Sequence, residues 1–264
     1  MSDTDSDDSH RSKPNYPIGS VDKALRLLRS FANHSAVRVA DVSKELDVAR
    51  STAHRLLEML QHHEFVQQDP VSRAYVAGPA LLKIGLAAVR KFDVRSLARP
   101  VIEDLVTQVQ ETAHLVVLSG NDMLIVDAVE SPRLLRIGSR LGGSVPAHAA
   151  AGGRALLANL PVARVEELYP KERLQPVTEQ TMTSRKELMC ALEAIRSCGY
   201  AISVGEVEPE VATVAAAIRT CSGRTTPAAI TISVPRSRVQ EEDLPRLGQA
   251  AVEAADRIAA LLDH

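Results

Sequence analysis

The chain has 264 residues, enough for about two domains. Its 31 basic and 33 acidic residues nearly cancel, which excludes a polycationic protein that binds nucleic acid through bulk charge, so any nucleic-acid contact must lie on one local surface. The 3 cysteines contain no C-x-x-C pair, and no apolar run approaches the roughly 18 residues of a membrane span. We therefore expect a cytoplasmic protein with no membrane segment, no disulfide framework and no metal or other cofactor.

The first 14 residues, MSDTDSDDSHRSKP, are polar and acidic. They have no large apolar residue after Met1 and cannot contribute to a core, which predicts a disordered tail over residues 1–14. The first folded domain is expected over residues 15–79. It opens with a helix capped near Ser20, whose apolar face is formed by Val21, Ala24, Leu25 and Leu28.

Two short helices with a tight corner between them are predicted over residues 39–60, VADVSKELDVARSTAHRLLEML. Apolar residues recur there at helical spacing. The first helix buries Val39, Val42 and Leu46, and the second buries Ala53, Leu56, Leu57 and Leu60. The corner at residues 47–49 has room only for a turn, with Val48 placed between the helices. This pattern is typical of a helix-turn-helix, whose second helix enters the DNA major groove.

Polar residues occupy the first turns of the second helix, opposite its apolar face. Arginine can pair with guanine, and serine and threonine can reach a base or a phosphate. Together with one serine of the preceding helix, the predicted DNA-binding residues of the two helices are Ser43, Arg50, Ser51, Thr52, His54 and Arg55. The spacing alone is also compatible with an ordinary surface helix.

An antiparallel hairpin is predicted directly after these helices. Phe65-Val66 begins an extended segment, residues 69–72 (DPVS) form a turn, and Tyr75-Val76 begins the returning strand. Helices followed by such a hairpin make a winged helix-turn-helix. Arg73 is expected at the tip of this wing, where it would contact the sugar-phosphate backbone.

These residues resemble the DNA-binding domain of the IclR family of bacterial transcriptional regulators. The resemblance covers SVDKALRLLRSF, VADVSKELDVARSTAHRLLEML and FVQQDPVSRAYVAGPALLKIG. Its most specific parts are the S-T-x-H-R-L-L signature at residues 51–57 and the Gly78-Pro79 pair after the wing. Asp47 departs from the family, which usually has glycine in the corner. Aspartate tolerates a left-handed backbone better than most residues, so the turn should survive at a modest cost.

A further helix is predicted over residues 80–92, because Leu82, Leu86 and Val89 share one face. The resemblance implies a linker helix that joins two domains and helps the chain to dimerise. The pattern is equally compatible with a core helix of the first domain. The second domain is expected over residues 93–264.

This second domain mixes strands and helices. One predicted helix ends at Gln110, and a second runs from about Ala150 to Leu160. A third runs from a capping box of Ser184 and Glu187 to Gly199, and a fourth covers Leu244–Leu262. The predicted strands cover residues 115–118, 123–129, the surroundings of 134–137, 200–204, 211–218 and 228–234. This order favours an α+β fold class, with a mostly antiparallel sheet in the second domain.

Three segments of the second domain also resemble the IclR family, namely VPAHAAAGGRALLANL, GYAISVGEVEPEV and AAITISVP. The departures are Ala150 where the family has threonine, Arg154 where it has lysine, and Glu210 where glycine is usual. The resemblance implies a GAF-like α/β sensor domain that binds a small-molecule effector and sets the geometry of the DNA-binding domains. It also implies a homodimer or homotetramer.

The candidate effector-binding residues lie in these segments. The Gly152-Gly153 pair at a helix N-terminus would let a ligand approach backbone amides, but it would equally allow close packing of the helix on a sheet. Alternation along residues 229–234 places Thr231 and Ser233 on one face of a strand, where their hydroxyls could also be satisfied within the sheet. The complete candidate set, some of it implied by the resemblance, is His148, Gly152, Gly153, Val211, Thr213, Thr231 and Ser233.

We interpret the chain as a ligand-responsive transcriptional regulator of double-stranded operator DNA, a repressor in preference to an activator. Backbone amides, hydroxyls and aliphatic side chains such as Val211 and Leu141, with few aromatic rings after Phe92, favour a small organic acid as the effector. Two other classes stay open. One is an architectural DNA-binding protein whose second domain only dimerises. The other is an enzyme built on His114, His148 and several serines, although a G-x-S-x-G elbow, a metal-spaced cluster and a dinucleotide fingerprint are all missing from the sequence.

Overall fold

The structure is a computed structural model that describes residues 16, 18–32, 34–90, 93–220 and 228–263. The chain divides into two compact units, Met1–Ala87 and Ala88–His264. The tail predicted over residues 1–14 lies outside the described residues. No helix in the described part of the chain is long and apolar enough to cross a membrane.

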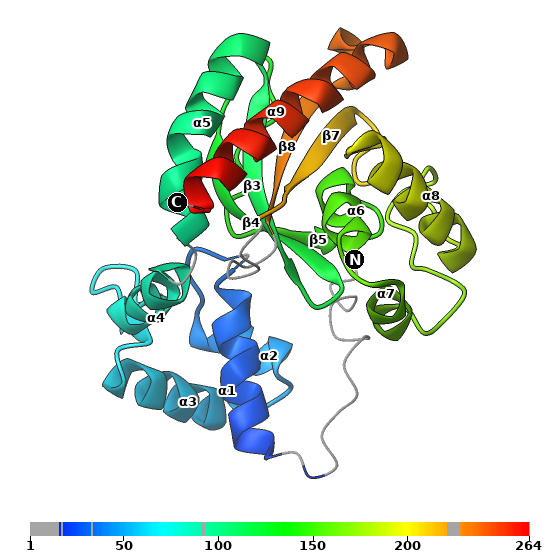
Figure 1. Cartoon of the computed structure of the whole chain (residues 1–264). Coiled ribbons are helices and arrows are strands. Elements are labelled where there is room, and N and C mark those ends of the chain that lie inside the picture. Colours follow the sequence, from blue (N-terminus) through cyan, green and yellow to red (C-terminus); the bar gives the residue numbers. More distant parts are fainter. Residues whose placement is uncertain (1–15, 17, 33, 91–92, 221–227, 264) are drawn as a thin grey trace. The chain divides into compact units, whose positions relative to one another are not determined.

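The N-terminal unit contains three helices followed by a short hairpin (Figure 1). The helices are α1 (Gly19–Ser30), α2 (Val39–Glu45) and α3 (Arg50–His62), and the antiparallel strands are β1 (Val66–Gln68) and β2 (Tyr75–Ala77). The N-cap of α1 is Ile18, two residues before Ser20, near which the cap was predicted. Helix α1 begins at Gly19, because the N–H of Asp22 already bonds to the carbonyl of Ile18 at 3.0 Å.

The core of this unit confirms the predicted helix-turn-helix. Its largest fully buried side chains include Leu27, Val42 and Leu57, one from each helix. Val48 packs at the edge of this core, between α2 and α3. Asp47 has the left-handed backbone expected of the corner, with φ of 49°. The turn therefore forms with aspartate in the place where glycine would be free of strain.

One contact ties the wing to the rest of the unit. The residue before the N-cap of α2, Val37, makes an antiparallel bridge to Tyr75, with backbone hydrogen bonds of 2.8 Å in both directions. Both side chains are buried in the core of the unit. The two-stranded wing is thus extended by one residue pair that comes from the connection between α1 and α2.

Helix α4 (Pro79–Arg90) follows the wing, where a linker helix over residues 80–92 was predicted. Residues 91–92 lie outside the described residues. The division between the two units falls within this helix. Leu82 and Ile84 are largely exposed, so this part of α4 is not a core helix of the first unit.

The C-terminal unit is built on a six-stranded antiparallel sheet with the order β5-β4-β3-β8-β7-β6. The strands are β3 (Thr112–Ser119), β4 (Asp122–Val129), β5 (Ser144–Pro146), β6 (Tyr200–Val204), β7 (Val211–Ile218) and β8 (Ala228–Pro235). The helices are α5 (Asp93–Val109), α6 (Ala151–Ala158), α7 (Val162–Leu168), α8 (Arg185–Cys198) and α9 (Leu244–Leu262). The predicted α+β class with an antiparallel sheet is confirmed.

Helices cover both faces of this sheet (Figure 1). On one face, α5 and α9 pack on alternate residues of the central strands, such as Leu115 of β3 and Ile230 of β8. On the other face, α6 and α8 pack on the intervening residues, such as Val116 and Ala229. Because side chains alternate along a strand, the hydroxyls predicted to share a face, Thr231 and Ser233, lie on the side of α6.

The strand predicted around residues 134–137 is wrong. That segment is a loop whose Leu134 and Leu135 side chains are 98% and 62% exposed. The edge of β4 is instead paired by β5, a three-residue strand that follows the glycine pair at residues 142–143. Local β propensity was misleading here, because the carbonyls of Leu135 and Ile137 accept hydrogen bonds from the side chains of Arg238 and Thr112 and not from a neighbouring strand.

The ends of α6 and α8 follow their sequence signals. Ser184 is the N-cap of α8, and its hydroxyl accepts the N–H of Glu187 at 3.4 Å. Gly199 is the C-cap of the same helix, with φ of 88°. Helix α6 lies close to the chain that precedes it, because a Cβ on Gly153 would stand 2.2 Å from the carbonyl oxygen of Ala147. Gly153 is therefore required for packing, which was one of its two predicted roles.

Candidate functional site

The polar face of α3 is open to solvent in the N-terminal unit. Ala53, Leu57 and Leu60 are buried, whereas the side chains predicted to contact DNA from this helix, Arg50, Ser51, Thr52, His54 and Arg55, are all exposed. His54 lies 3.3 Å from Glu58 one turn later. The sequence therefore places the apolar stripe inward and leaves a row of donors outside, as a helix in a major groove requires.

The wing tip and the start of α3 share one concave surface. Arg50 of α3 and Arg73 of the wing line it together with Arg38, the N-cap residue of α2. Three arginines around one hollow, next to the N-termini of two helices, suit the phosphates of a nucleic-acid backbone. Arg38 was missed from the sequence because it precedes the apolar pattern, although its basic charge at a helix start was a usable signal.

The wing turn is held by Asp69. One of its carboxylate oxygens accepts the N–H groups of Val71 and Ser72 and the hydroxyl of Ser72, at 3.1, 2.6 and 2.7 Å. These hydrogen bonds, the backbone one from Ser72 first, lower the pKa of Asp69 below its ordinary value. Arg73 follows with φ of 57°. The turn thus fixes the backbone from which Arg73 extends.

Ser43 has a different environment from the other predicted DNA-binding residues. Its hydroxyl donates to the carbonyl of Val48 at 2.7 Å, across the corner between α2 and α3. The side chain is only partly exposed. Its hydroxyl therefore stabilises the corner, and in this conformation its proton is not available to a phosphate.

A cavity of about 80 Å³ lies in the C-terminal unit between the sheet and α6. A single water needs roughly 10–15 Å³ measured in this way, so the cavity has room for a small organic molecule. Of the predicted effector-binding residues, Gly152, Val211, Thr213, Thr231 and Ser233 line it. Apolar side chains such as Val116, Met123 and Ile137 form most of the remaining wall.

Two predicted residues lie away from this cavity. His148 is buried beside Tyr169, with ring centroids 6.0 Å apart, and its Nε2 lies 2.9 Å from the carbonyl oxygen of Gln175. Gly153 faces the backbone of Ala147. Both residues position α6 and its neighbours, and neither is among the residues that line the cavity.

Arg154 also serves the fold. Its guanidinium forms a two-pronged ion pair with Glu206, at 2.6 and 2.9 Å, and donates to the carbonyl of Ile202 at 2.6 Å. The hydroxyl of Thr181 donates to the carbonyl of Glu206 at 2.6 Å. The ion pair therefore attaches the loop between β6 and β7 to α6, and that loop supplies part of the cavity wall.

Two further residues of the cavity wall carry charge. Arg140, from the loop before β5, forms an ion pair with Glu208, from the loop between β6 and β7. Both side chains are about half exposed, and both line the cavity. This pair could not be predicted from two residues so far apart in the chain, because only the fold brings the two loops together.

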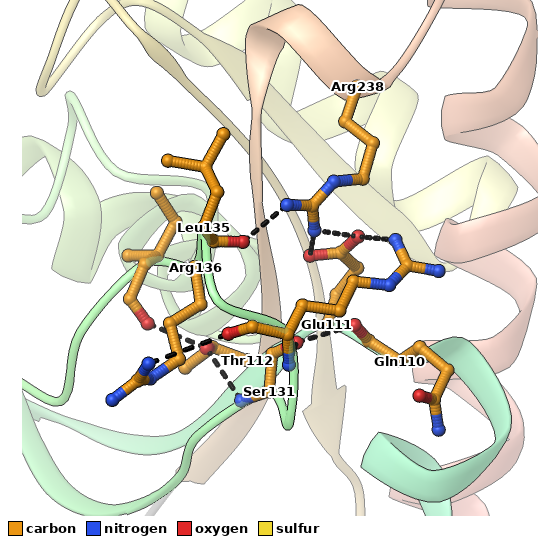
Figure 2. Close-up of polar contacts among 9 residues, drawn as sticks. Gln110, Glu111, Thr112, Ser131, Leu135, Arg136 and Arg238 are labelled. Atoms are coloured by element: carbon orange, nitrogen blue, oxygen red, sulfur yellow. Dashed lines mark hydrogen bonds and ion pairs between the residues drawn. The ribbon is translucent and has the colours of Figure 1, made fainter.

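A buried carboxylate anchors the loop over residues 130–141 (Figure 2). Glu111 accepts Arg133 at 2.7 Å and Arg238 at 2.7 and 2.8 Å. Arg238 also donates to the carbonyl of Leu135. A charge this buried is tolerated because two guanidinium groups and their hydrogen bonds replace its water.

Thr112 adds a second anchor for the same loop (Figure 2). Its hydroxyl donates to the carbonyl of Ile137 at 2.6 Å and accepts the N–H of Ser131 at 3.0 Å. The hydroxyl of Ser131 donates to the carbonyl of Gln110 at 2.7 Å. Ile137 is thereby held against the cavity.

His114 lies on β3, opposite Thr231 of β8, and lines the cavity. Its Nδ1 is 3.3 Å from the hydroxyl of Thr231. Burial lowers the pKa of His114 from 6.5 to about 4; the carbonyl of Gly138 opposes this shift, and the charge of Arg140 adds to it. The imidazole is therefore neutral at physiological pH. Sequence reasoning noted His114 only as part of an enzyme alternative.

Comparison with known proteins agrees with this arrangement. Residues 20–70 match the IclR helix-turn-helix domain, and residues 86–260 match the C-terminal domain of IclR bacterial transcriptional regulators. The second match alone spans well over half of the chain. The chain belongs to the IclR family. Members of this family are transcriptional regulators, which removes the enzyme alternative.

Several relatives resemble the chain over most of its length. The Escherichia coli regulator XynR is 30% identical over 94% of this chain and 98% of its own. The Klebsiella pneumoniae repressor AllR is 31% identical over 85% of this chain and 82% of its own. The protein RHA06195 from Rhodococcus sp. RHA1, known as a crystal structure, is 30% identical, with a TM-score of 0.76 over 92% of this chain and 98% of that one.

The arginines of the N-terminal unit give a first prediction. Arg50→Ala should weaken binding to specific DNA by about 1–3 kcal/mol and relax the base preference, if it reads a base edge. Arg73→Ala should weaken specific and random DNA alike and reduce the salt slope of binding by about 1. Fluorescence anisotropy over a salt series measures both effects. Arg164→Ala, an exposed arginine of the other unit, is the control, and unchanged binding in both test variants would contradict the assignment.

His114 gives a prediction about pH. In the unfolded chain it takes up a proton near pH 6.5, whereas in the folded chain it does so only near pH 4, so stability falls as pH falls between these values. Lowering the pH from 7 to 5 should cost about 2 kcal/mol through this group. His114→Gln should remove that part of the pH dependence in urea unfolding. The exposed His62→Gln should not, and an equal effect of both substitutions would contradict the prediction.

Proposed function

We propose that the chain is an effector-controlled repressor that binds operator DNA through α3 and the wing. The observation that carries the proposal is the combination of two sites in one chain. One is the arginine-lined hollow beside an exposed polar helix, and the other is the cavity between α6 and the sheet. By analogy with the repressor AllR, the proposed effect on transcription is repression and not activation.

The chemistry of the cavity supports a small organic acid as effector. Gly152 lies at the start of α6, where backbone N–H groups have no carbonyl partner within the helix and favour negative charge. Arg140 supplies the opposite charge to a carboxylate at the same cavity. The hydroxyls of Thr213, Thr231 and Ser233 add neutral hydrogen-bonding groups, and the other walls are largely aliphatic.

The ion pair of Arg140 with Glu208 suggests how binding could be transmitted. An effector carboxylate and the Glu208 carboxylate compete for the same guanidinium, so a bound acid would displace Glu208. Because Glu208 belongs to the loop between β6 and β7, its release would free that loop from the loop over residues 130–141. The effector would thereby favour a second conformation of the unit.

DNA recognition by a single α3 would read only a few base pairs, and specific affinity at physiological salt generally needs more. We therefore propose that an even number of chains, a homodimer or a homotetramer, binds a palindromic or repeated site. Sedimentation of the protein on its operator should show two or four chains. A single chain on one half-site would contradict this part of the proposal.

The effector proposal predicts a gain of affinity from one substitution. Titration calorimetry of a panel of small organic acids against the full chain should identify acids that bind. Fluorescence anisotropy of labelled operator DNA should then show that these acids release the DNA. Glu208→Gln should bind such an acid about tenfold more tightly, because the competing carboxylate is gone. Glu210→Gln, an exposed carboxylate two residues along the same loop, should leave the affinity unchanged.

Two outcomes would count against it. Failure of every acid to bind, with tight binding of a large aromatic or cationic compound, would reject the acid class. A DNA complex that responds to no small molecule at all would favour an architectural protein whose second domain only dimerises. Loss of two cavity hydroxyls in Thr213→Val with Ser233→Ala should weaken binding, and Thr107→Val on α5 is the matched control.

A further inference from the structure

One polar atom that belongs to the cavity wall has no partner in the fold. Among the residues that the structure describes, only two buried side-chain polar atoms lack a hydrogen bond, Nε2 of His114 and Nε of Arg154. The other guanidinium nitrogens of Arg154 are bound to Glu206 and Ile202. His114 is 4% exposed and lines the cavity, so its Nε2 is the unsatisfied polar side-chain atom among the residues of the cavity wall.

The surroundings of the ring satisfy Nδ1 but give Nε2 no hydrogen bond of normal geometry. Nδ1 faces the hydroxyl of Thr231 at 3.3 Å, which occupies the other nitrogen. The carbonyl of Gly138 acts as a weak backbone hydrogen-bond acceptor that raises the pKa of His114, but no hydrogen bond of normal geometry to Nε2 results. A buried polar atom without a partner destabilises a fold, so its presence at a cavity points to a group that arrives from outside.

The charge state of the ring limits what that group can be. A neutral imidazole presents one donor and one acceptor nitrogen, and Thr231 accommodates either arrangement because a hydroxyl both donates and accepts. A hydroxyl on the ligand has the same property and therefore matches Nε2 in either tautomer. A second carboxylate or an ammonium group would fit only one tautomer and would bring a further charge into a buried region.

We propose that His114 is a specificity-determining residue, whose Nε2 hydrogen-bonds a hydroxyl of the effector and so selects small hydroxy acids over simple acids of equal length. This inference rests on the proposed binding of an organic acid. Arg140 and the start of α6 hold the carboxylate of the effector, and His114 holds its hydroxyl oxygen. Selection follows because an acid without the hydroxyl leaves Nε2 buried and unpaired.

A matched pair of acids tests the inference. Lactate and propionate differ only in one hydroxyl, and both are small enough for the cavity. Calorimetry on the full chain should show about tenfold tighter binding of lactate to the wild-type protein. His114→Phe keeps a ring of similar size without nitrogens, and it should bind both acids with the affinity that the wild type has for propionate. His114→Gln keeps a donor and an acceptor and should retain part of the preference.

The outcomes separate this inference from the proposed function. If the wild type binds both acids equally, or if His114→Phe keeps the preference for lactate, His114 is not the determinant, while acid binding stands. If neither acid binds, the inference is wrong, and the wider acid panel then decides the proposed function independently. If His114→Phe does not fold, as judged by circular dichroism, the preference retained or lost in His114→Gln decides the question, with Thr107→Val as the control.

Discussion

The close approach of α6 to the segment before it determines most of the geometry of the C-terminal unit. At Gly153 there is no space for a Cβ atom beside the backbone of Ala147, and at Gly152 a Cβ would stand 2.6–2.9 Å from side chains of the sheet face. Two adjacent residues without side chains let the helix start directly above β3 and β8. The cavity and the parts of its wall supplied by Gly152 and Thr231 all depend on this contact.

Two polar groups that the sequence suggested for ligand or DNA binding are used inside the fold, and so is Arg154, which pairs with Glu206. His148 bonds to the main chain beside Tyr169, and Ser43 closes the corner of the helix-turn-helix. Each of these groups is buried or partly buried, so its hydrogen-bonding capacity must be met by the protein itself. His114 differs from them because one of its nitrogens has no such partner.

Sequence periodicity was enough to predict the elements and much of the candidate surface. The apolar spacing located α2 and α3, and strand alternation placed Thr231 and Ser233 on the same face. It failed where position depends on contacts distant in the chain. Residues 134–137 have the composition of a strand, but side chains from distant parts of the chain bind their carbonyls and hold them as a loop. The charged pair of Arg140 and Glu208 likewise exists only because two loops meet. His114 could not be singled out either, since neither its burial nor the hydrogen bond that its Nε2 lacks is visible in a sequence.

The bridge between Val37 and Tyr75 makes the wing depend on the connection between α1 and α2. The strands of the wing are short, and the third partner of the hairpin comes from the connection that leads into α2. The residues that lead directly into α2 from Val37 therefore couple the position of α2 to that of the wing. A change in the number of residues there would shift Arg73 relative to Arg50 even if every DNA-facing side chain were kept. Variation in the length of this connection among relatives would alter the separation of the DNA phosphates that the two arginines can contact together. The spacing of the operator could therefore change without a change in the recognition helix.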